Sequence, residues 1–324
     1  YESDAAYAAR LRDDLARAAA RLRDMTGAGP RAIVWPHGAA NGIAQETAAA
    51  LGMVFSFDRR REACDPEAAS CGRLIVERDT FLGTLVERLR TPNLPAPVRV
   101  IQVSVDFLAD PDPAQFARNL AALVERVKRL GVNAVYLQAF VDTSAKGVAE
   151  ELYFQARHLP TRVDVFGLVA ATLKRQTGVA VYAWLPVLAF AAKDPTLKVQ
   201  SLNPGTEEPV PDPGYLERLS PFVPQSRQII LDIYEDLAKH SAFDGIMFND
   251  DARLSDFEDA NPQALASKPA SGLPGDVEAL RADPALTDQW TIAKTEALIA
   301  LTREIEAVVE KHRGPVRTAR NIFP

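Results

Sequence analysis

Residues 243–252 decide the fold, and they read Phe243-Asp244-Gly245-Ile246-Met247-Phe248-Asn249-Asp250-Asp251-Ala252. The apolar run from Ile246 to Phe248 predicts a buried strand that ends in two adjacent carboxylates. In parallel α/β folds, residues just past the C-terminal ends of strands line the active-site face. Neighbouring acids repel each other, which separates their pKa values and suits one to donate a proton while the other stays charged. The pair therefore indicates cleavage of a glycosidic bond. The structural alternative is a helix N-cap followed by a first-turn acid.

Composition narrows the class of protein. The chain has 324 residues, of which 47% are hydrophobic and 25% charged, as in ordinary globular proteins with one large domain or two smaller ones. A net charge of −6 argues against nucleic acid or an anionic membrane as the main partner. No apolar run reaches the roughly 18 residues that a transmembrane segment needs.

Strand and helix patterns alternate regularly after residue 97. Strands are expected at Val98–Val105, Ala134–Ala139, Ala180–Leu185, Gly245–Phe248 and Val316–Asn321, and helices at Pro113–Leu130, Val163–Thr177, Pro224–Lys239 and Thr287–His312. Gly131 and Gly178 stand where helix C-caps are expected. Polar residues follow nearly every strand, and no Gly-rich nucleotide-binding motif occurs. The pattern favours a (β/α)8 barrel, in which several strand ends supply one site, over a doubly wound sheet.

The chain divides into three predicted parts. In residues 1–90 the pattern predicts helices at Ala5–Met25, Ile43–Leu51 and Thr80–Arg90 and strands at Ala32–Trp35 and Met53–Phe57. The Pro-rich residues 91–97 read as a linker. Residues 98–324 form the barrel, but five predicted strands fall short of eight. We therefore expect a barrel truncated at its C-terminus, in a chain that is a fragment of a longer protein, marginally stable and nearly inactive.

Two cysteines, Cys64 and Cys71, lie in a short polar stretch. A disulfide between them would indicate an oxidising compartment such as the periplasm, and two free thiols are the alternative. A zinc site is not expected, because no second Cys or His pair stands nearby.

Four longer blocks carry a family resemblance: Val135-Tyr136-Leu137-Gln138-Ala139-Phe140, Glu151-Leu152-Tyr153-Phe154-Gln155-Ala156-Arg157-His158-Leu159-Pro160, Val181-Tyr182-Ala183-Trp184-Leu185-Pro186-Val187-Leu188, and the run from Phe243 to Asp259. Together they resemble the PgaB family, periplasmic enzymes that process the biofilm polysaccharide poly-β-1,6-N-acetylglucosamine. Family members join a polysaccharide deacetylase domain to a glycoside hydrolase barrel. The segment with Trp35-Pro36-His37-Gly38 is similar to the last part of that deacetylase domain.

The resemblance implies hydrolysis of partially de-N-acetylated polymer by the barrel, without a cofactor. A divalent metal is expected only in a complete deacetylase domain, because its Asp and His motifs do not occur before Trp35 and His37 alone cannot build the site. The resemblance also implies a periplasmic location at the outer membrane and an export porin as a partner. Two alternatives remain: a non-catalytic module that binds polysaccharide and guides its export, and an unrelated barrel hydrolase acting on another sugar.

Catalytic roles fall on Asp250 and Asp251. In such enzymes one acid orients the substrate's 2-acetamido group and its neighbour protonates the leaving oxygen, and we favour Asp250 as the proton donor. The family usually has His before the pair, whereas this chain has Asn249, which cannot titrate.

Six further residues are candidates for binding substrate, each with a structural alternative. Asp106 follows the first strand and would otherwise cap a turn, Gln138 shares a strand face with Tyr136, and Trp184 would stack on a sugar or pack under a loop. Arg157 and His158 would touch substrate or pin their own loop. Asp256 would bind the amine of a deacetylated sugar; otherwise it and Glu258 are solvated loop acids.

Overall fold

The computed structural model describes residues 2–36, 40–57, 71, 98–202, 209–210, 217–267 and 272–322. Among the sequence predictions, His37, Cys64, the helix at Thr80–Arg90 and the linker at 91–97 lie outside these residues. The disulfide and the linker therefore stay predictions. The chain forms two compact units, Tyr1–Val98 with Glu310–Gly314, and Arg99–Val309 with Pro315–Pro324.

The smaller unit contains two helices and two short parallel strands. Helix α1 (Asp4–Thr26) is followed by β1 (Ala32–Val34), α2 (Gly42–Ala50) and β2 (Phe55–Phe57), and β1 pairs with β2. Ser3 caps α1 and Gly27, at φ 77°, ends it in the left-handed conformation that glycine favours. Ala19, Trp35, Ala44, Ala48 and Met53 form its small core. The first two predicted helices and strands are confirmed, with bounds that differ by one or two residues.

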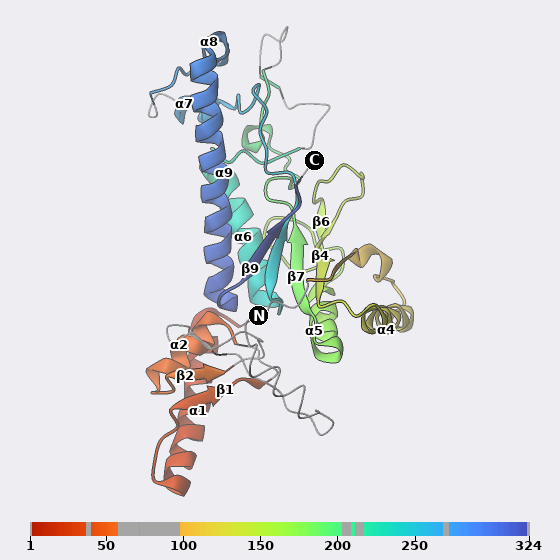
Figure 1. Ribbon diagram of the computed structural model, residues 1–324, viewed down its shortest axis with the longest axis vertical. Coiled ribbons are helices and arrows are strands. Elements are labelled where there is room, and N and C mark those ends of the chain that lie inside the picture. Colours follow the sequence, from red (N-terminus) through yellow and green to blue (C-terminus); the bar gives the residue numbers. More distant parts are fainter. Residues whose placement is uncertain are drawn as a thin grey trace. The chain divides into compact units, whose positions relative to one another are not determined.

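The larger unit is built on one five-stranded parallel sheet (Figure 1). Its strands are β3 (Val100–Val103), β4 (Ala134–Gln138), β7 (Ala180–Leu185), β8 (Gly245–Phe248) and β9 (Arg317–Arg320), and they lie side by side in chain order. A doubly wound sheet would reverse its order at a switch point. Within the described residues no such reversal occurs, so the strands wind in one direction, as barrel strands do.

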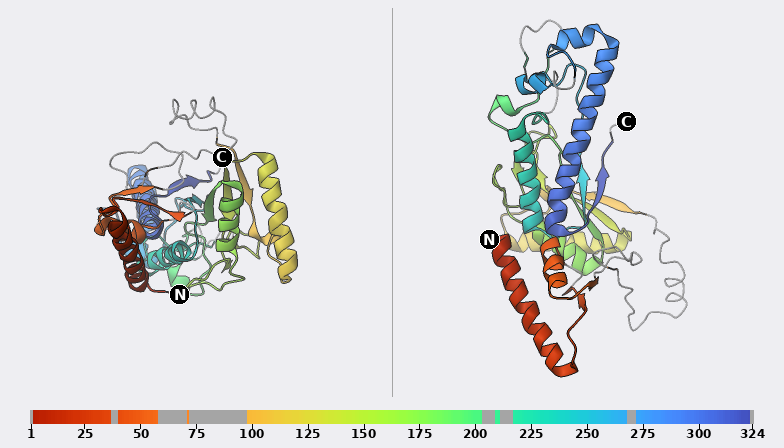
Figure 2. Two further views of the ribbon diagram at one scale, coloured as in Figure 1. Left: turned by 90° about the horizontal axis from the view of Figure 1, so that it is seen from below. Right: turned by 90° about the vertical axis from the view of Figure 1, so that its left-hand side faces the viewer.

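Four helices cover one face of this sheet: α4 (Pro113–Leu130), α5 (Phe166–Thr177), α6 (Pro224–His240) and α9 (Pro284–Arg313). Figure 2 shows α6 and α9 side by side along the sheet. Each helix buries an apolar stripe in the main core, such as Leu120, Val124 and Val127 of α4. Gly131 and Gly178 end α4 and α5 in the left-handed conformation, as the sequence predicts.

Alternate residues of β7 show which face the helices cover. Val181, Ala183 and Leu185 are fully buried, whereas Tyr182 and Trp184 are only partly buried. Tyr182 meets Tyr136 of β4 edge to face, with ring centroids 5.3 Å apart. The sheet therefore has an apolar face under helices and a second face that carries aromatic and polar side chains toward the site.

Shorter elements complete the larger unit. They are the 3-10 turns η2 (Val105–Phe107) and η3 (Pro195–Leu197), the antiparallel pair β5 (Phe140–Val141) and β6 (Glu151–Leu152), and helices α7 (Pro262–Ser267) and α8 (Val277–Ala282). The first barrel strand is shorter than predicted because Ser104 caps the turn η2, which ends β3 at Val103. None of the helices in the described part of the chain has the length and apolar character needed to cross a membrane.

Candidate active site at the carboxyl ends of the strands

Asp250 lies just past the C-terminal end of β8, as the sequence predicts. Asn249 continues the strand ladder, because its amide donates to the carbonyl of Leu185 at 3.0 Å. Asp250 is partly exposed, and it lines a depression of about 390 Å³ together with Asn249, Ala252, Arg253, Arg320, Asn321 and Ile322. Its carboxylate is therefore open to a ligand at the strand ends.

Asp251 has the opposite environment. Its side chain is fully buried, and its oxygens accept from the amides of Val187 (3.0 Å), Leu188 (2.6 Å) and Ala189 (2.7 Å). Burial raises the pKa of Asp251, and these amide donors work against that shift. The carboxylate thus ties the end of β8 to the loop after β7.

Trp184 and Asn249 meet beside Asp250. The indole N–H of Trp184 donates to the side-chain oxygen of Asn249 at 3.1 Å, and Phe140 approaches the indole edge to face at 6.0 Å. Gln138, 8% exposed, is the register partner of Trp184 and so points from the same face of the sheet. Three predicted site residues, Gln138, Trp184 and Asp250, therefore lie at the carboxyl ends of three successive strands.

Asp106 lies at the same edge of the sheet, in the turn η2 after β3. It accepts hydrogen bonds from the buried Tyr153 hydroxyl and from the Ser104 hydroxyl, the latter at 2.7 Å. Burial, and next the bond to Asp106, raise the pKa of Tyr153. Phe107, beside Asp106, is 85% exposed. Sequence reasoning missed both aromatic residues, because nothing in the local pattern distinguishes them from core residues.

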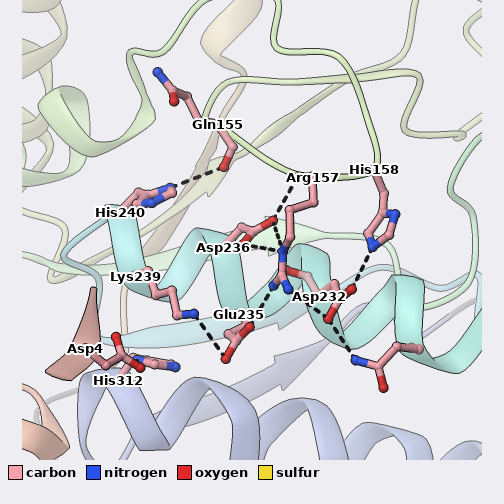
Figure 3. A network of polar contacts seen from close by, with 11 residues as sticks. Asp4, Gln155, Arg157, His158, Asp232, Glu235, Asp236, Lys239, His240 and His312 are labelled. Atoms are coloured by element: carbon pink, nitrogen blue, oxygen red, sulfur yellow. Dashed lines mark hydrogen bonds and ion pairs between the residues drawn. The ribbon is translucent and has the colours of Figure 1, made fainter. Parts of the chain in front are cut away.

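Arg157 and His158 bind helix α6 instead of reaching the strand ends (Figure 3). The Arg157 guanidinium contacts Asp232 at 3.2 Å, Glu235 at 2.7 Å and Asp236 at 2.9 Å. His158 contacts the other oxygen of Asp232 at 2.7 Å. The structure thus matches the alternative in which these two side chains pin their own loop.

The loop after Asp251 contains one exposed acid and two buried ones. Asp256 is exposed. The expectation that Glu258 is solvated is wrong: it is 4% exposed and pairs with the buried Arg218 at 2.5 Å. Asp259 is fully buried and accepts from the hydroxyl of Ser220 and the amides of Gln200 and Asn261. Burial raises the pKa of Asp259 to about 6. Three of their partners, Arg218, Ser220 and Gln200, lie 39 to 59 residues away in the sequence, so a local pattern could not reveal them.

Metal binding gains no support from the described residues, which contain no group of three His, Cys, Asp or Glu side chains able to hold an ion.

Comparison with known proteins places the chain in a family. Residues 102–324 match the model of hypothetical glycosyl hydrolase family 13. The poly-beta-1,6-N-acetyl-D-glucosamine N-deacetylases of Escherichia coli K12 and O157:H7 are each 37% identical over 326 residues, which cover 100% of this chain and 48% of theirs. The chain therefore spans about half the length of these curated relatives.

A solved structure agrees with the sequence comparisons. The PgaB (BpsB) glycoside hydrolase domain of Bordetella bronchiseptica is 46% identical with a TM-score of 0.64, over 70% of this chain and 65% of that one. With its parallel α/β sheet and its strand-end carboxylate, the chain belongs to hypothetical glycosyl hydrolase family 13 and is a homologue of the PgaB proteins.

Proposed function

We propose that the larger unit hydrolyses partially de-N-acetylated poly-β-1,6-N-acetylglucosamine, with Asp250 as the general acid. The observation that carries the proposal is the contrast within the acid pair: Asp250 lines the open depression, whereas Asp251 is buried with its oxygens on backbone amides. The similarity to the E. coli N-deacetylases of this polymer supports the choice of polymer, and the similarity to the Bordetella glycoside hydrolase domain supports the reaction class.

In this mechanism Asp250 protonates the glycosidic oxygen of the leaving sugar. The carbonyl oxygen of the substrate's 2-acetamido group attacks the anomeric carbon as the glycosidic bond breaks, so that the protein needs no carboxylate nucleophile. Water then attacks the same carbon, opens the resulting ring and restores the acetamido group, while its proton returns to Asp250. We assign Asp251 a positioning role, because a carboxylate committed to three amides has little capacity left for a substrate group. It fixes the chain at Val187–Ala189 and, through the backbone, the site of its neighbour Asp250.

The remaining site residues would hold the polymer. Trp184 offers an aromatic ring held by Asn249 and Phe140, and the exposed Phe107 offers a second one beside Asp106. Aromatic faces suit the apolar side of a sugar ring. Asp106 would accept hydrogen bonds from sugar hydroxyl groups, and Gln138 would accept from or donate to hydroxyl and amide groups. Asp256 would form an ion pair with the amine of a deacetylated sugar. Arg157 and His158 would act only by holding their loop.

Around this site we propose the architecture of the longer relatives. The five strands would be part of a (β/α)8 barrel, preceded by the end of a deacetylase-like domain. The barrel would work without a cofactor, and a divalent metal would belong only to a complete deacetylase domain. The protein would act in the periplasm at the outer membrane, next to an export porin.

One observation favours a second function. Asp251 is buried, so Asp250 has no accessible carboxylate beside it in the sequence. A depression whose lining contains one acid, Asp250, would also suit a module that binds the polysaccharide and guides it to export.

Measuring the reducing ends released from partially deacetylated polymer, with polymer binding in parallel, tests the proposal. Asp250→Asn should lower the release at least ~100-fold while binding persists, because this is the scale of one general acid. Asp288→Asn, at an exposed position of α9, is the matched control and should leave release unchanged. Equal release by the Asp250 variant would exclude Asp250 as the acid, and binding without any release by the unmodified protein would favour the guiding module.

A further inference from the structure

The loop that follows the acid pair is held by a buried guanidinium from outside the loop. Arg218 is 2% exposed. It donates through one nitrogen to the carbonyl of Arg253 and through another to Glu258 at 2.5 Å. The second oxygen of Glu258 accepts from the amide of Ser255 at 2.9 Å. One side chain therefore fixes the loop at two points, about five residues apart.

A buried ammonium group grips the same loop from helix α9. Lys294 is 3% exposed, and its Nζ donates to the carbonyls of Ser255 at 2.7 Å and Glu258 at 3.1 Å. Burial lowers the pKa of Lys294, and the charges of Asp256, Glu258 and Asp259 oppose that shift. Two cations from separate parts of the chain thus bind three carbonyl groups of the loop, at positions 253, 255 and 258.

A direct backbone link joins this loop to the acid pair. The amide of Arg253 donates to the carbonyl of Asp251 at 2.9 Å. A shift of the Arg253 carbonyl would therefore be passed to Asp251 and to Asp250 beside it.

Stability alone does not account for burying these charges. Apolar residues of similar volume often stabilise a protein as well as a buried ion pair does, because desolvation offsets the attraction. A guanidinium adds geometric specificity, because its planar set of N–H donors fixes where the acceptor groups must lie. Lys174 and Asp244, which pair at 2.5 Å near the opposite ends of the strands, provide a more exposed comparison pair.

We propose that Arg218, together with Glu258 and Lys294, is a positioning residue that fixes the loop after Asp250 for cleavage of the polymer. This inference rests on the proposed hydrolase function. Arg218 touches no substrate; it sets the place of the proton donor through the Arg253 carbonyl.

The test uses the double variant Arg218→Met/Glu258→Gln in the full chain. It removes both charges together, so that neither is left buried and unpaired, and the Gln oxygen can still accept from Ser255. The matched control is Lys174→Met/Asp244→Asn. Thermal unfolding of both variants identifies a temperature at which both are folded, and the other measurements are made there.

The first readout needs no enzymatic activity. Trypsin cleaves after Arg253, whose carbonyl accepts a hydrogen bond from Arg218. In the double variant this cleavage should become about tenfold faster or more, and hydrogen exchange of the Ser255 amide should accelerate as well. The control should match the unmodified protein at this bond. Unchanged cleavage and exchange in the double variant would overturn the proposal.

The second readout separates kcat from KM on the polymer. In the double variant, misplacing the acid should lower kcat about tenfold or more with little change in KM. The single variant Arg218→Lys should lose less kcat than the double variant, because it keeps a cation beside Glu258. An unchanged kcat in a variant with a loosened loop would overturn the catalytic role. If the unmodified chain releases no reducing ends, or if Asp250→Asn is fully active, the hydrolase function itself fails, and the protease readout still decides whether Arg218 holds the loop.

Discussion

Asp250 and Asp251 are neighbours in the chain but face different surroundings. Asn249 makes the last ladder bond of β8, and the two residues after it leave the ladder. The carboxylate of Asp250 turns to the open edge, whereas that of Asp251 turns under the loop after β7. The same residue type thus offers an accessible carboxylate at one position and an anchor for three amides at the next.

Replacing Asp251 by Asn tests the anchor. The new NH2 group would face backbone N–H donors that now bond to oxygen, so we expect a loss of about 1–3 kcal/mol of unfolding free energy. Asp250→Asn should leave the stability almost unchanged. Urea unfolding of both variants measures the difference, and equal stabilities would show that the amides do not depend on the charge of Asp251.

Asp259 predicts a pH dependence of stability. Its folded-state pKa of about 6 exceeds the 3.8 of a free Asp, so the folded protein holds this proton more tightly than the unfolded chain does. Its stabilising contribution is present below pH 3.8 and is lost as the pH rises through about 6, by an amount on the order of 3 kcal/mol.

Asp259→Asn should abolish this dependence, since Asn can keep the bonds to Ser220, Gln200 and Asn261 without titrating. The measurement is urea unfolding from pH 4 to 8, reported as the difference from the unmodified protein. Asp288→Asn, which is exposed, should show a constant difference over the same range. A constant difference for Asp259→Asn as well would contradict the assignment.

At the scale of the elements, β8 can lie between its neighbours only because Gly245 has no side chain. A Cβ there would come within 2.4 Å of the Tyr182 ring and 2.6 Å of the Arg317 carbonyl oxygen. Both β7 and β9 would have to move to accept it.

Gly245→Ala should therefore destabilise the larger unit by about 1–3 kcal/mol, the usual range for overpacking. Gly29→Ala is the control, because a Cβ there meets only the flexible end of Arg23, at 3.1 Å. Denaturant unfolding compares the two, and a neutral Gly245 variant would mean that the strands separate more easily than the packing indicates.

The regular elements could be predicted well from the sequence because their signals are local. The predicted bounds of β7, β8 and α4 match those observed, since apolar periodicity and caps at Asp112 and Gly131 act over a few residues. The predicted start of α9, Thr287, is wrong by one turn, as the helix begins at Pro284, a residue favoured in the first turn.

The site could be predicted only in part. The strand ends led to Asp250, Trp184 and Gln138, because a parallel sheet brings all carboxyl ends to one edge. The loop partners could not be predicted, because Arg218 meets Glu258 across 40 residues and Asp251 meets Leu188 across 63. Such pairs depend on how irregular loops fold over the sheet, and the hydrophobic periodicity of the sequence carries no information about loop contacts.

At the scale of the whole molecule, β9 is the last strand of the sheet among the described residues, and its far edge carries no strand there. Unpaired edges promote self-association unless charged side chains oppose it. Arg317, exposed at the start of β9, is placed to do so.

Arg317→Leu should therefore increase self-association of the chain. Arg126→Leu removes the same charge from the exposed surface of α4, away from any strand edge, and should have a smaller effect. Sedimentation velocity over a range of protein concentrations measures both. Equal association of the two variants would assign the effect to lost charge instead of to the strand edge.

The three amide bonds to Asp251 have a consequence for the proposed polymer substrate. The loops after β7 and β8 are joined by this carboxylate and by Asp259, so the segment after β8 that lines the depression should move with the loop after β7 as one rigid body. A preorganised wall loses little conformational entropy on binding, and the ordering then falls on the ligand. A 1,6-linked sugar chain has an additional rotatable bond at each linkage and is therefore floppy in solution. On the proposed function, the rate at which the polymer adopts an extended conformation, more than any movement of the protein, would then limit how often a glycosidic bond reaches Asp250. A conformationally stiffer polymer should therefore be hydrolysed faster.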